Sequence, residues 1–256
     1  MARLNDKDAE TRRQRELAGT ANPADFSEAL ARGLAVLSAF GKDRKRLTQA
    51  DLARQLGLSR ATVRRAVLTL EHLGYLVADG RAYELTPRVL GLAGAYLTSN
   101  LISTVVQPVC DRVCAQFKAS CSAAVLDGDE AVMIARAIRQ SLLIVGSGVG
   151  YRVPAASSAL GKVLLAHLDT LPEASPVAGP GRESLREIRQ AGYCYVANDV
   201  EPGFHSIAVP VSRWDGRVVA ALNVGAAIEH LSPQEMQGSV LEVLRTYAED
   251  LRAQLV

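Results

Sequence analysis

Hydrophobic residues in the first third of the chain recur every three or four positions, which is the spacing of one helix face. The pattern begins with Phe26, Leu30, Leu34 and Leu37. Gly33 lies inside it and indicates a close contact with another helix, because a glycine in a helix interior costs about 1 kcal/mol relative to alanine. The helices predicted in this part of the chain cover residues 26–40, 49–56 and 59–73.

A β-hairpin is predicted directly after these helices. Two short runs rich in β-forming residues flank Asp79-Gly80, a dipeptide typical of two-residue hairpin turns. The hairpin covers residues 75–85. A helix rich in leucine and alanine is expected over residues 88–101, where it would connect the hairpin to the rest of the chain.

From Pro108 onward, helical and strand patterns alternate. Helices are predicted over residues 109–118, 157–167, 183–191 and 233–254, and strands over residues 122–126, 131–137, 142–145, 206–211 and 218–224. Asp-Gly pairs at residues 127–128 and 215–216 join neighbouring strands directly, which requires those strands to be antiparallel. The second part of the chain is therefore predicted to be an α+β domain with an antiparallel sheet.

Charge is distributed unevenly along the chain. The 256 residues carry a net charge of +2, but residues 1–90 hold 16 Lys and Arg against 11 Asp and Glu, and residues 91–256 hold 13 against 16. A polyanionic partner is therefore expected to contact the first third. The content of 48% hydrophobic and 22% charged residues is typical of a globular protein and excludes a wholly disordered chain.

The sequence favours a cytoplasmic protein with no membrane partner. Cys110, Cys114, Cys121 and Cys194 form no C-x-x-C pair and are expected to be free thiols in a reducing compartment. The first 24 residues mix both charges without the apolar core of a secretory signal, and they are expected to form a mobile tail. No run of 18 apolar residues predicts a membrane span.

Residues 48–73 have the spacing of a helix-turn-helix. Ala53 is small where two helices would cross, Gly57 follows where the turn needs a positive φ, and Val63 can pack back onto the first helix. The segment from Lys42 to Arg65 holds eight basic and two acidic residues. Arginines on such a helix can pair with guanine edges or phosphates.

The predicted hairpin makes this the winged variant, with Arg81 at the hairpin tip. An ordinary helical hairpin with a solvated basic face is the alternative, but the turn glycine, the capping serine, the basic helix and the hairpin together favour DNA binding. Whether Arg64 and Arg65 contact bases or phosphates is left open. The residues expected to contact DNA are Thr48, Ser59, Arg60, Thr62, Arg64, Arg65 and Arg81.

Catalytic and metal-binding motifs are missing from the sequence. The histidines, His72, His167, His205 and His230, fit neither H-E-x-x-H nor a Cys/His metal spacing. Neither G-x-S-x-G nor S-x-x-K occurs. We expect no enzyme activity, no metal and no cofactor.

From Phe26 to Leu251 the chain resembles the IclR family of bacterial transcriptional regulators. The similar segments are ALARGLAVLSAF (29–40), LTQADLARQLGLSRATVRRAVLTLEHLGYL (47–76), LTPRVLGLAGAYL (85–97), PAASSALGKVLLAHL (154–168), IRQAGY (188–193) and GFHSIAVPVSRWDGRVVAALNV (203–224). Within the family, SIAVP and AALNV of the last segment are similar to the branch that regulates aromatic catabolism through the β-ketoadipate pathway.

The resemblance implies a winged helix-turn-helix, a linker helix and an effector-binding domain with a GAF/profilin-like fold. It also implies homodimers or homotetramers that bind double-stranded operator DNA and small organic acids. The expected domains are a tail over residues 1–24, the winged helix-turn-helix over 25–87, the linker helix over 88–106 and the effector-binding domain over 107–256.

A bound organic acid needs donors such as hydroxyls, a helix N-terminus or a cation. Ser157 and Ser158 stand at the start of a predicted helix, with N-capping alone as their alternative role. Asn223 interrupts an apolar strand, which favours a place in a pocket. Candidate carboxylate partners, with solvated surface positions as the alternative, are Arg136, Arg139 and Arg152. The resemblance adds Ala159, Leu160, Asp199, Glu201, Phe204 and Ser206.

These features predict a ligand-responsive, sequence-specific DNA-binding regulator of a catabolic operon. It would sense a small organic or aromatic acid and act as a repressor or an activator. The alternative is a small-molecule sensor that acts through a protein partner, with the basic first third docked on an acidic surface. Salt-dependent and sequence-preferring DNA binding would distinguish the two hypotheses.

Overall fold

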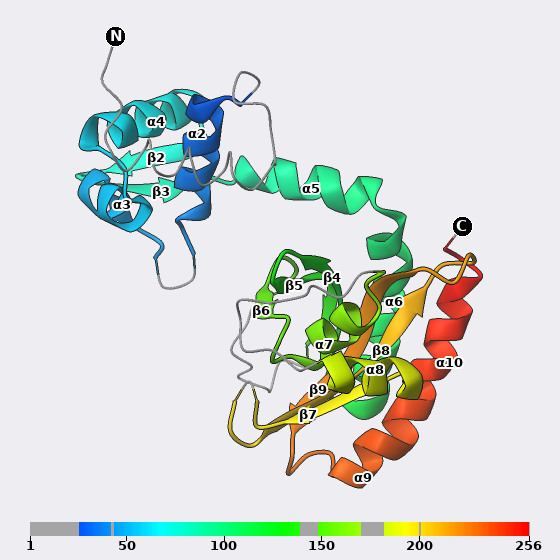
Figure 1. The fold of residues 1–256 in the computed structure, drawn as a ribbon. Helices are drawn as coiled ribbons and strands as arrows, with labels where there is room; N and C mark the ends of the chain where they lie inside the picture. Colours follow the sequence, from blue (N-terminus) through cyan, green and yellow to red (C-terminus); the bar gives the residue numbers. More distant parts are fainter. Residues whose placement is uncertain (1–25, 42–43, 139–147, 170–181, 200, 256) are drawn as a thin grey trace. The chain divides into compact units, whose positions relative to one another are not determined.

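The computed structural model describes residues 26–41, 44–138, 148–169, 182–199 and 201–255 (Figure 1). The chain divides into two compact units, and the division lies between Gly94 and Ala95. This point falls inside the segment expected to link the two domains. The expected tail over residues 1–24 and the expected strand over residues 142–145 lie outside the described residues.

The N-terminal unit packs helices against a small antiparallel sheet with strand order β1-β3-β2. Its elements are α2 (Glu28–Ser38), β1 (Leu47–Thr48), α3 (Gln49–Leu56), α4 (Arg60–His72), β2 (Leu76–Asp79) and β3 (Ala82–Leu85). This order confirms the predicted helix-turn-helix followed by a hairpin. The two residues of β1 are too few to leave a pattern in the sequence. The prediction for Gly33 is wrong, because a side chain there would meet no atom within 4 Å.

Two helices, not one, follow the hairpin. α5 covers Val89–Ser99 and α6 covers Leu101–Phe117, so the helix predicted over residues 88–106 is interrupted. The cause is Asn100, whose extended backbone and side chain cap α6, with Oδ1 accepting from the N–H of Ile102 at 3.0 Å. No single described helix is long and apolar enough to cross a membrane, and α5 and α6 pass that test only as a pair bent by 88°.

The C-terminal unit is built on a six-stranded antiparallel sheet (Figure 1). Across the sheet the strands are β6 (Arg152–Pro154), β5 (Glu130–Ala137), β4 (Ser120–Asp127), β9 (Val218–Ala227), β8 (Phe204–Ser212) and β7 (Cys194–Ala197). The helices beside α6 are α7 (Ala159–Ala166), α8 (Arg182–Ala191), α9 (Pro233–Glu235) and α10 (Leu241–Arg252). A π-helical turn at Met236–Val240 joins α9 to α10, so the predicted last helix is interrupted.

Alternate residues of each strand face different helices. On β8, Ile207 and Val209 belong to the core formed with α6 and α10, whereas Ala208 packs with Leu160 and Val163 of α7. The sheet is therefore a middle layer, with α6 and α10 on one face and α7 on the other (Figure 1). The expected α+β class with an antiparallel sheet is confirmed.

Candidate functional site: a DNA-binding helix and an effector cavity

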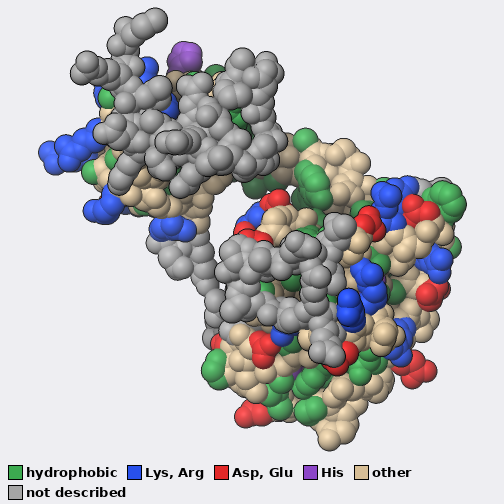
Figure 2. Space-filling model, viewed as in Figure 1, with side chains coloured by type: hydrophobic (Ala, Val, Ile, Leu, Met, Phe, Trp, Pro, Cys, Tyr) green, Lys and Arg blue, Asp and Glu red, His purple; other side chains and the backbone are tan. Residues whose placement is uncertain are grey.

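Lys and Arg side chains project from the edge of the N-terminal unit that carries α3 and α4 (Figure 2). α3 ends at Gly57, which has a φ of 64°, and the N–H of Leu58 donates to the carbonyl of Ala53 at 3.1 Å. This left-handed turn lets the chain reverse direction at once into α4. Val63 and Val67 of α4 are fully buried, so the opposite face of the helix points to solvent.

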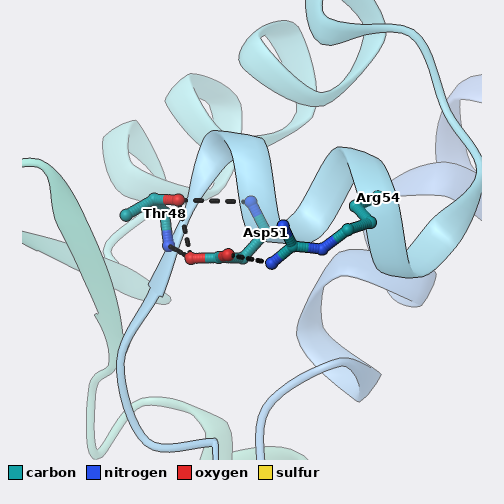
Figure 3. A network of polar contacts seen from close by, with 3 residues as sticks. All are labelled: Thr48, Asp51 and Arg54. Atoms are coloured by element: carbon teal, nitrogen blue, oxygen red, sulfur yellow. Dashed lines mark hydrogen bonds and ion pairs between the residues drawn. The ribbon is translucent and has the colours of Figure 1, made fainter.

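The start of α3 is fixed by a capping box (Figure 3). Oγ1 of Thr48 accepts from the N–H of Asp51 at 3.2 Å, and Oδ2 of Asp51 accepts from the N–H and the hydroxyl of Thr48 at 3.1 and 2.7 Å. Arg54 donates to Oδ1 of Asp51 at 2.5 Å. The bonds from Thr48 hold the pKa of the Asp51 carboxyl below its ordinary value. The hydroxyl proton of Thr48, a predicted DNA contact, is therefore directed to Asp51.

The exposed face of α4 presents a cluster of arginines. Ser59 caps the helix by accepting from the N–H of Thr62 at 3.2 Å, and the two hydroxyls lie 2.9 Å apart. Arg60, Arg64 and Arg65 are exposed, and none forms an ion pair with another residue that the structure describes. At 100° per residue, Arg65 points almost directly away from the buried face, and Arg64 and Arg60 lie about 100° and 140° from Arg65 on one side of the helix. These guanidinium groups are available to a polyanion.

The wing carries two acidic residues that share one arginine. Arg46 pairs with Asp79 and with Glu84, the second pair at 3.1 Å. Arg81 is exposed at the turn between β2 and β3 and lies in no ion pair with the described residues. Arg46 and Arg81 together balance the two carboxylates, so the wing has no net charge, and Arg81 at its tip is the cation that can reach a phosphate.

A cavity of about 70 Å³ lies in the C-terminal unit, between the sheet and the start of α7. Seven of the predicted effector contacts line it, namely Ser158, Ala159, Leu160, Glu201, Phe204, Ser206 and Asn223. The other lining residues are Ser120, Ser122, Met133, Arg136, Tyr151 and Val153. The volume is smaller than the roughly 150 Å³ of a cavity that admits benzene, so an aromatic ligand requires lining side chains to move.

Three polar lining residues lie in one row across the sheet. Ser122 of β4 is paired with Arg136 of β5 on one side and with Asn223 of β9 on the other. Neighbouring strands are about 4.8 Å apart, so the main chains of Arg136 and Asn223 are separated by roughly 10 Å. A ligand with polar groups at both ends can reach both side chains.

Two polar atoms of this row are buried without a hydrogen-bond partner among the described residues, Nε of Arg136 and Oδ1 of Asn223. Burial lowers the pKa of the Arg136 guanidinium, which nevertheless stays charged at neutral pH. Its nearest described companions are the Sδ of Met133 and the ring of Tyr151, whose centroid is 5.8 Å away. Buried polar atoms without partners are costly at both ends of this row unless a bound molecule pairs with them.

The remaining candidates lie elsewhere. Asp199 pairs with Lys162 at 2.7 Å, and Arg152 pairs with Asp127 and Glu130 at the surface. Ser157 precedes Ser158, whose Oγ caps α7 by accepting from the N–H of Gly161 at 3.1 Å, and Ser157 itself does not line the cavity. Arg139 lies outside the described residues. Within those residues, no group of three His, Cys, Asp or Glu side chains could hold a metal ion.

His205 lies behind the cavity on the opposite face of β8. It is fully buried, and its Nδ1 lies 2.9 Å from the hydroxyl of Tyr195. Burial lowers its pKa below the ordinary value of 6.5. The unfolded chain therefore binds the proton more readily than the folded chain, and the stability that neutral His205 supports is lost as the pH falls below about 6.5.

We expect the melting temperature to decrease between pH 7 and pH 5, and to decrease less in His205→Gln, which keeps an acceptor for Tyr195 without the titration. Part of the decrease will remain, because burial also lowers the pKa of His167. Calorimetric melts of both proteins at matched ionic strength measure the difference. Parallel pH profiles would show that His205 contributes nothing to the acid sensitivity.

Comparison with protein families accounts for both units. Residues 29–80 match the IclR helix-turn-helix domain, and residues 94–175 and 182–253 match the bacterial transcriptional regulator IclR C-terminal domain. The chain belongs to the IclR family. As a member of this family it is a ligand-responsive transcription regulator, as the resemblance in its sequence predicted.

Two similar IclR relatives are known from bacteria. The Pca regulon regulatory protein of Pseudomonas putida is 38% identical, with 90% of this chain and 85% of the relative covered. The p-hydroxybenzoate hydroxylase transcriptional activator of Acinetobacter baylyi is 37% identical, with 89% and 92% covered. A solved IclR homologue from Microbacterium hydrocarbonoxydans, in complex with 4-hydroxybenzoate, has a TM-score of 0.73 at 27% identity and covers 89% of this chain and 99% of its own.

Proposed function

We propose that this IclR-family regulator senses a hydroxy-substituted aromatic carboxylate in the cavity beside α7. The half-buried guanidinium of Arg136 carries this proposal, because its Nε is buried without a partner and the described residues supply no acidic group to it. The carboxylate of the ligand would pair with Arg136. A hydroxyl at the other end would donate to Oδ1 of Asn223, with Glu201 as a second acceptor in the lining. The relatives that regulate aromatic catabolism, and the homologue that holds 4-hydroxybenzoate, support the same class of ligand.

Asn223 is expected to select for the hydroxyl group. The wild-type protein should bind 4-hydroxybenzoate about fivefold more tightly than benzoate, since one satisfied hydrogen bond contributes about 1 kcal/mol. In Asn223→Leu the preference should disappear while benzoate affinity stays within about threefold. Isothermal titration with the two acids measures both values, and thermal shift confirms that the variant is folded. An equal loss for both acids would contradict the assigned role, and no binding by the wild type would overturn the ligand class.

For the DNA interface, we propose that Arg60, Arg64 and Arg65 of α4 enter the major groove, with Ser59 and Thr62 at the helix start and Arg81 of the wing on a phosphate. Apolar side chains of α2 and α5 support a homodimer, because Leu30, Leu34 and Leu90 are 64%, 52% and 66% exposed and a second copy would cover them. Two copies would place two recognition helices about 34 Å apart on a near-palindromic site.

Arg65→Ala is expected to weaken binding to a selected operator duplex by about 5- to 150-fold, which corresponds to the loss of 1–3 kcal/mol for a base contact. Arg64→Ala tests whether an arginine on the side of the same helix also contributes to DNA affinity. Arg217→Ala, an exposed arginine of the C-terminal unit, is the matched control and should leave affinity unchanged. Anisotropy titrations at two salt concentrations separate base contacts from phosphate contacts. Unchanged DNA affinity in both Arg64→Ala and Arg65→Ala would exclude α4 as the recognition helix.

Regulation of transcription, rather than catalysis, is the activity that this arrangement supports. The cavity brings together a cation, hydroxyls and an amide, and its relatives are regulators. Binding to chromosomal DNA would place the protein in the cytoplasm. The alternative, a sensor acting on a protein partner, predicts no preference for any DNA sequence and is excluded if the wild type selects one duplex from a random pool.

A further inference from the structure

Gln107 of α6 is bonded to the main chain of the residue that provides the cation of the cavity. Its Oε1 accepts from the N–H of Arg136 at 3.0 Å, and its Nε2 donates to the carbonyl of Arg136 at 3.1 Å. The same Nε2 lies 3.0 Å from Oδ1 of Asp111, one turn later on α6. Both polar atoms of this half-buried amide are therefore engaged.

Arg136 needs such a partner because of its place in the sheet. On the outer side of β5, the strand β6 pairs only with Glu130, Ala131 and Val132. The N–H and C=O of one residue in an antiparallel strand point to the same side. At Arg136 they point away from β4, beyond the end of β6, and the amide of Gln107 takes the place of the missing strand. Without it, two main-chain groups would lose their partners.

Arg136 thus joins two parts of the unit. Its side chain lines the cavity, and its main chain is held by α6. Any shift of β5 as the guanidinium takes up a carboxylate is transmitted to Gln107. α6 in turn begins at Asn100, the residue that directly follows α5.

The turn of α6 that carries Gln107 lacks one main-chain hydrogen bond. Pro108 follows Gln107 and has no N–H to donate to the carbonyl of Thr104. Beyond Pro108 the helix is anchored by the buried side chains of Val109 and Val113. Before Pro108, Val106 is also fully buried in the same core, so the helix can bend only locally at the missing bond, and Gln107 lies at that junction.

We propose that Gln107 is the positioning residue that couples ligand binding at Arg136 to the start of α6, and through the chain of α5 to the DNA response. This role rests on the proposed function, since it requires a ligand on Arg136. The amide favours one arrangement of the first turns of α6, and the ligand-bound position of β5 favours another. Coupling of this kind appears as a difference between the two ligand states and not as a change in either affinity alone.

The test uses the full chain, 4-hydroxybenzoate and a duplex selected by the wild-type protein. The coupling factor is the ratio of the DNA dissociation constants with and without saturating ligand. In Gln107→Leu we expect this factor to fall from at least fivefold to within twofold of unity, while ligand-free DNA affinity stays within threefold and ligand affinity within fivefold. Gln107→Glu, which keeps the acceptor for the N–H of Arg136, should retain an intermediate factor. Gln116→Leu, on the last turns of the same helix, should behave as wild type.

The outcomes separate the two proposals. If the wild type responds to ligand and both Gln107 variants respond equally, the role of Gln107 is overturned and the proposed function stands. If both variants lose ligand and DNA affinity together with thermal stability, the amide is only a structural bond, which also overturns the role. If the wild type neither binds nor responds to the acid, the proposed function fails and the role of Gln107 fails with it.

Discussion

Gly161→Ala is expected to prevent stable folding of the C-terminal unit. A methyl group on Gly161 would lie 2.1 Å from the Cα and 2.3 Å from the carbonyl oxygen of Ala155. Carbon atoms in contact are normally 3.5–4.0 Å apart, so both atoms would have to move by more than 1 Å. Neither belongs to a flexible side chain that could turn away. We expect a loss of about 4 kcal/mol or more, which exceeds the usual 1–3 kcal/mol for overpacking.

Ala155 has little freedom to yield. Its N–H donates to the carbonyl of Asp129 at 2.9 Å, and the carbonyl of Pro154 before it accepts from the N–H of Ser158 at 3.2 Å. Ser158 then caps α7 through the N–H of Gly161. Movement of Ala155 would therefore disturb the end of β6, the start of α7 and the wall of the cavity together.

Urea denaturation followed by far-ultraviolet circular dichroism measures the effect. Gly238→Ala is the matched control, because a side chain at Gly238 would meet no atom within 4 Å, and alanine is favoured over glycine in helical segments. The control should be as stable as wild type or slightly more stable. A Gly161→Ala protein with wild-type stability would mean that α7 does not approach Ala155 as closely as described.

Gly33 and Gly161 show where sequence reasoning stops. Both stand in helices whose pattern is easily recognised, and the pattern correctly predicts α2 and α7. It cannot show that Gly33 faces open space while Gly161 rests on another main chain. The space around each glycine depends on how distant segments pack, such as the segment before α7, and the local hydrophobic pattern contains no information about that packing. Likewise the helix pattern runs through Asn100, because its capping bond is decided by one backbone conformation.

The cavity was only partly predictable for a similar reason. A polar residue in an apolar strand pointed to Asn223, the family resemblance pointed to Ser206, and both line it. The sequence could not distinguish between Arg136, Arg139 and Arg152 as carboxylate partners. The structure places Arg136 in the lining of the cavity and Arg152 in a surface ion cluster with Asp127 and Glu130. The resemblance also pointed to Asp199, which does not line the cavity and instead pairs with Lys162.

Arg136→Leu is expected to abolish the ligand response while leaving the protein folded. A carboxylate that enters the cavity of this variant would be buried without a cation. Removal of one partner from a desolvated charge pair costs 2–5 kcal/mol or more, so we expect affinity for 4-hydroxybenzoate to fall by at least about 30-fold. Arg136→Lys keeps the charge without the planar fork and should bind with intermediate affinity.

Arg152→Leu is the matched control, because Arg152 is on the neighbouring strand and exposed, with its charge already used by Asp127 and Glu130. It should bind the acid as wild type does. Isothermal titration gives the affinities. If Arg136→Leu and Arg152→Leu lose affinity for the acid equally, the positive potential of the protein surface attracts the acid, and not a contact with Arg136.

The thermal stability of ligand-free Arg136→Leu gives an independent check. In the empty cavity the Nε of Arg136 has no partner among the described residues, and its charge is partly desolvated. Replacing such a charge by an apolar side chain of similar reach is often neutral or stabilising. The melting temperature of the variant should therefore equal or exceed that of the wild type without ligand and no longer rise when the acid is added. A large decrease would instead mean that the guanidinium is already paired in the free protein, and the argument for an anionic ligand would lose its basis.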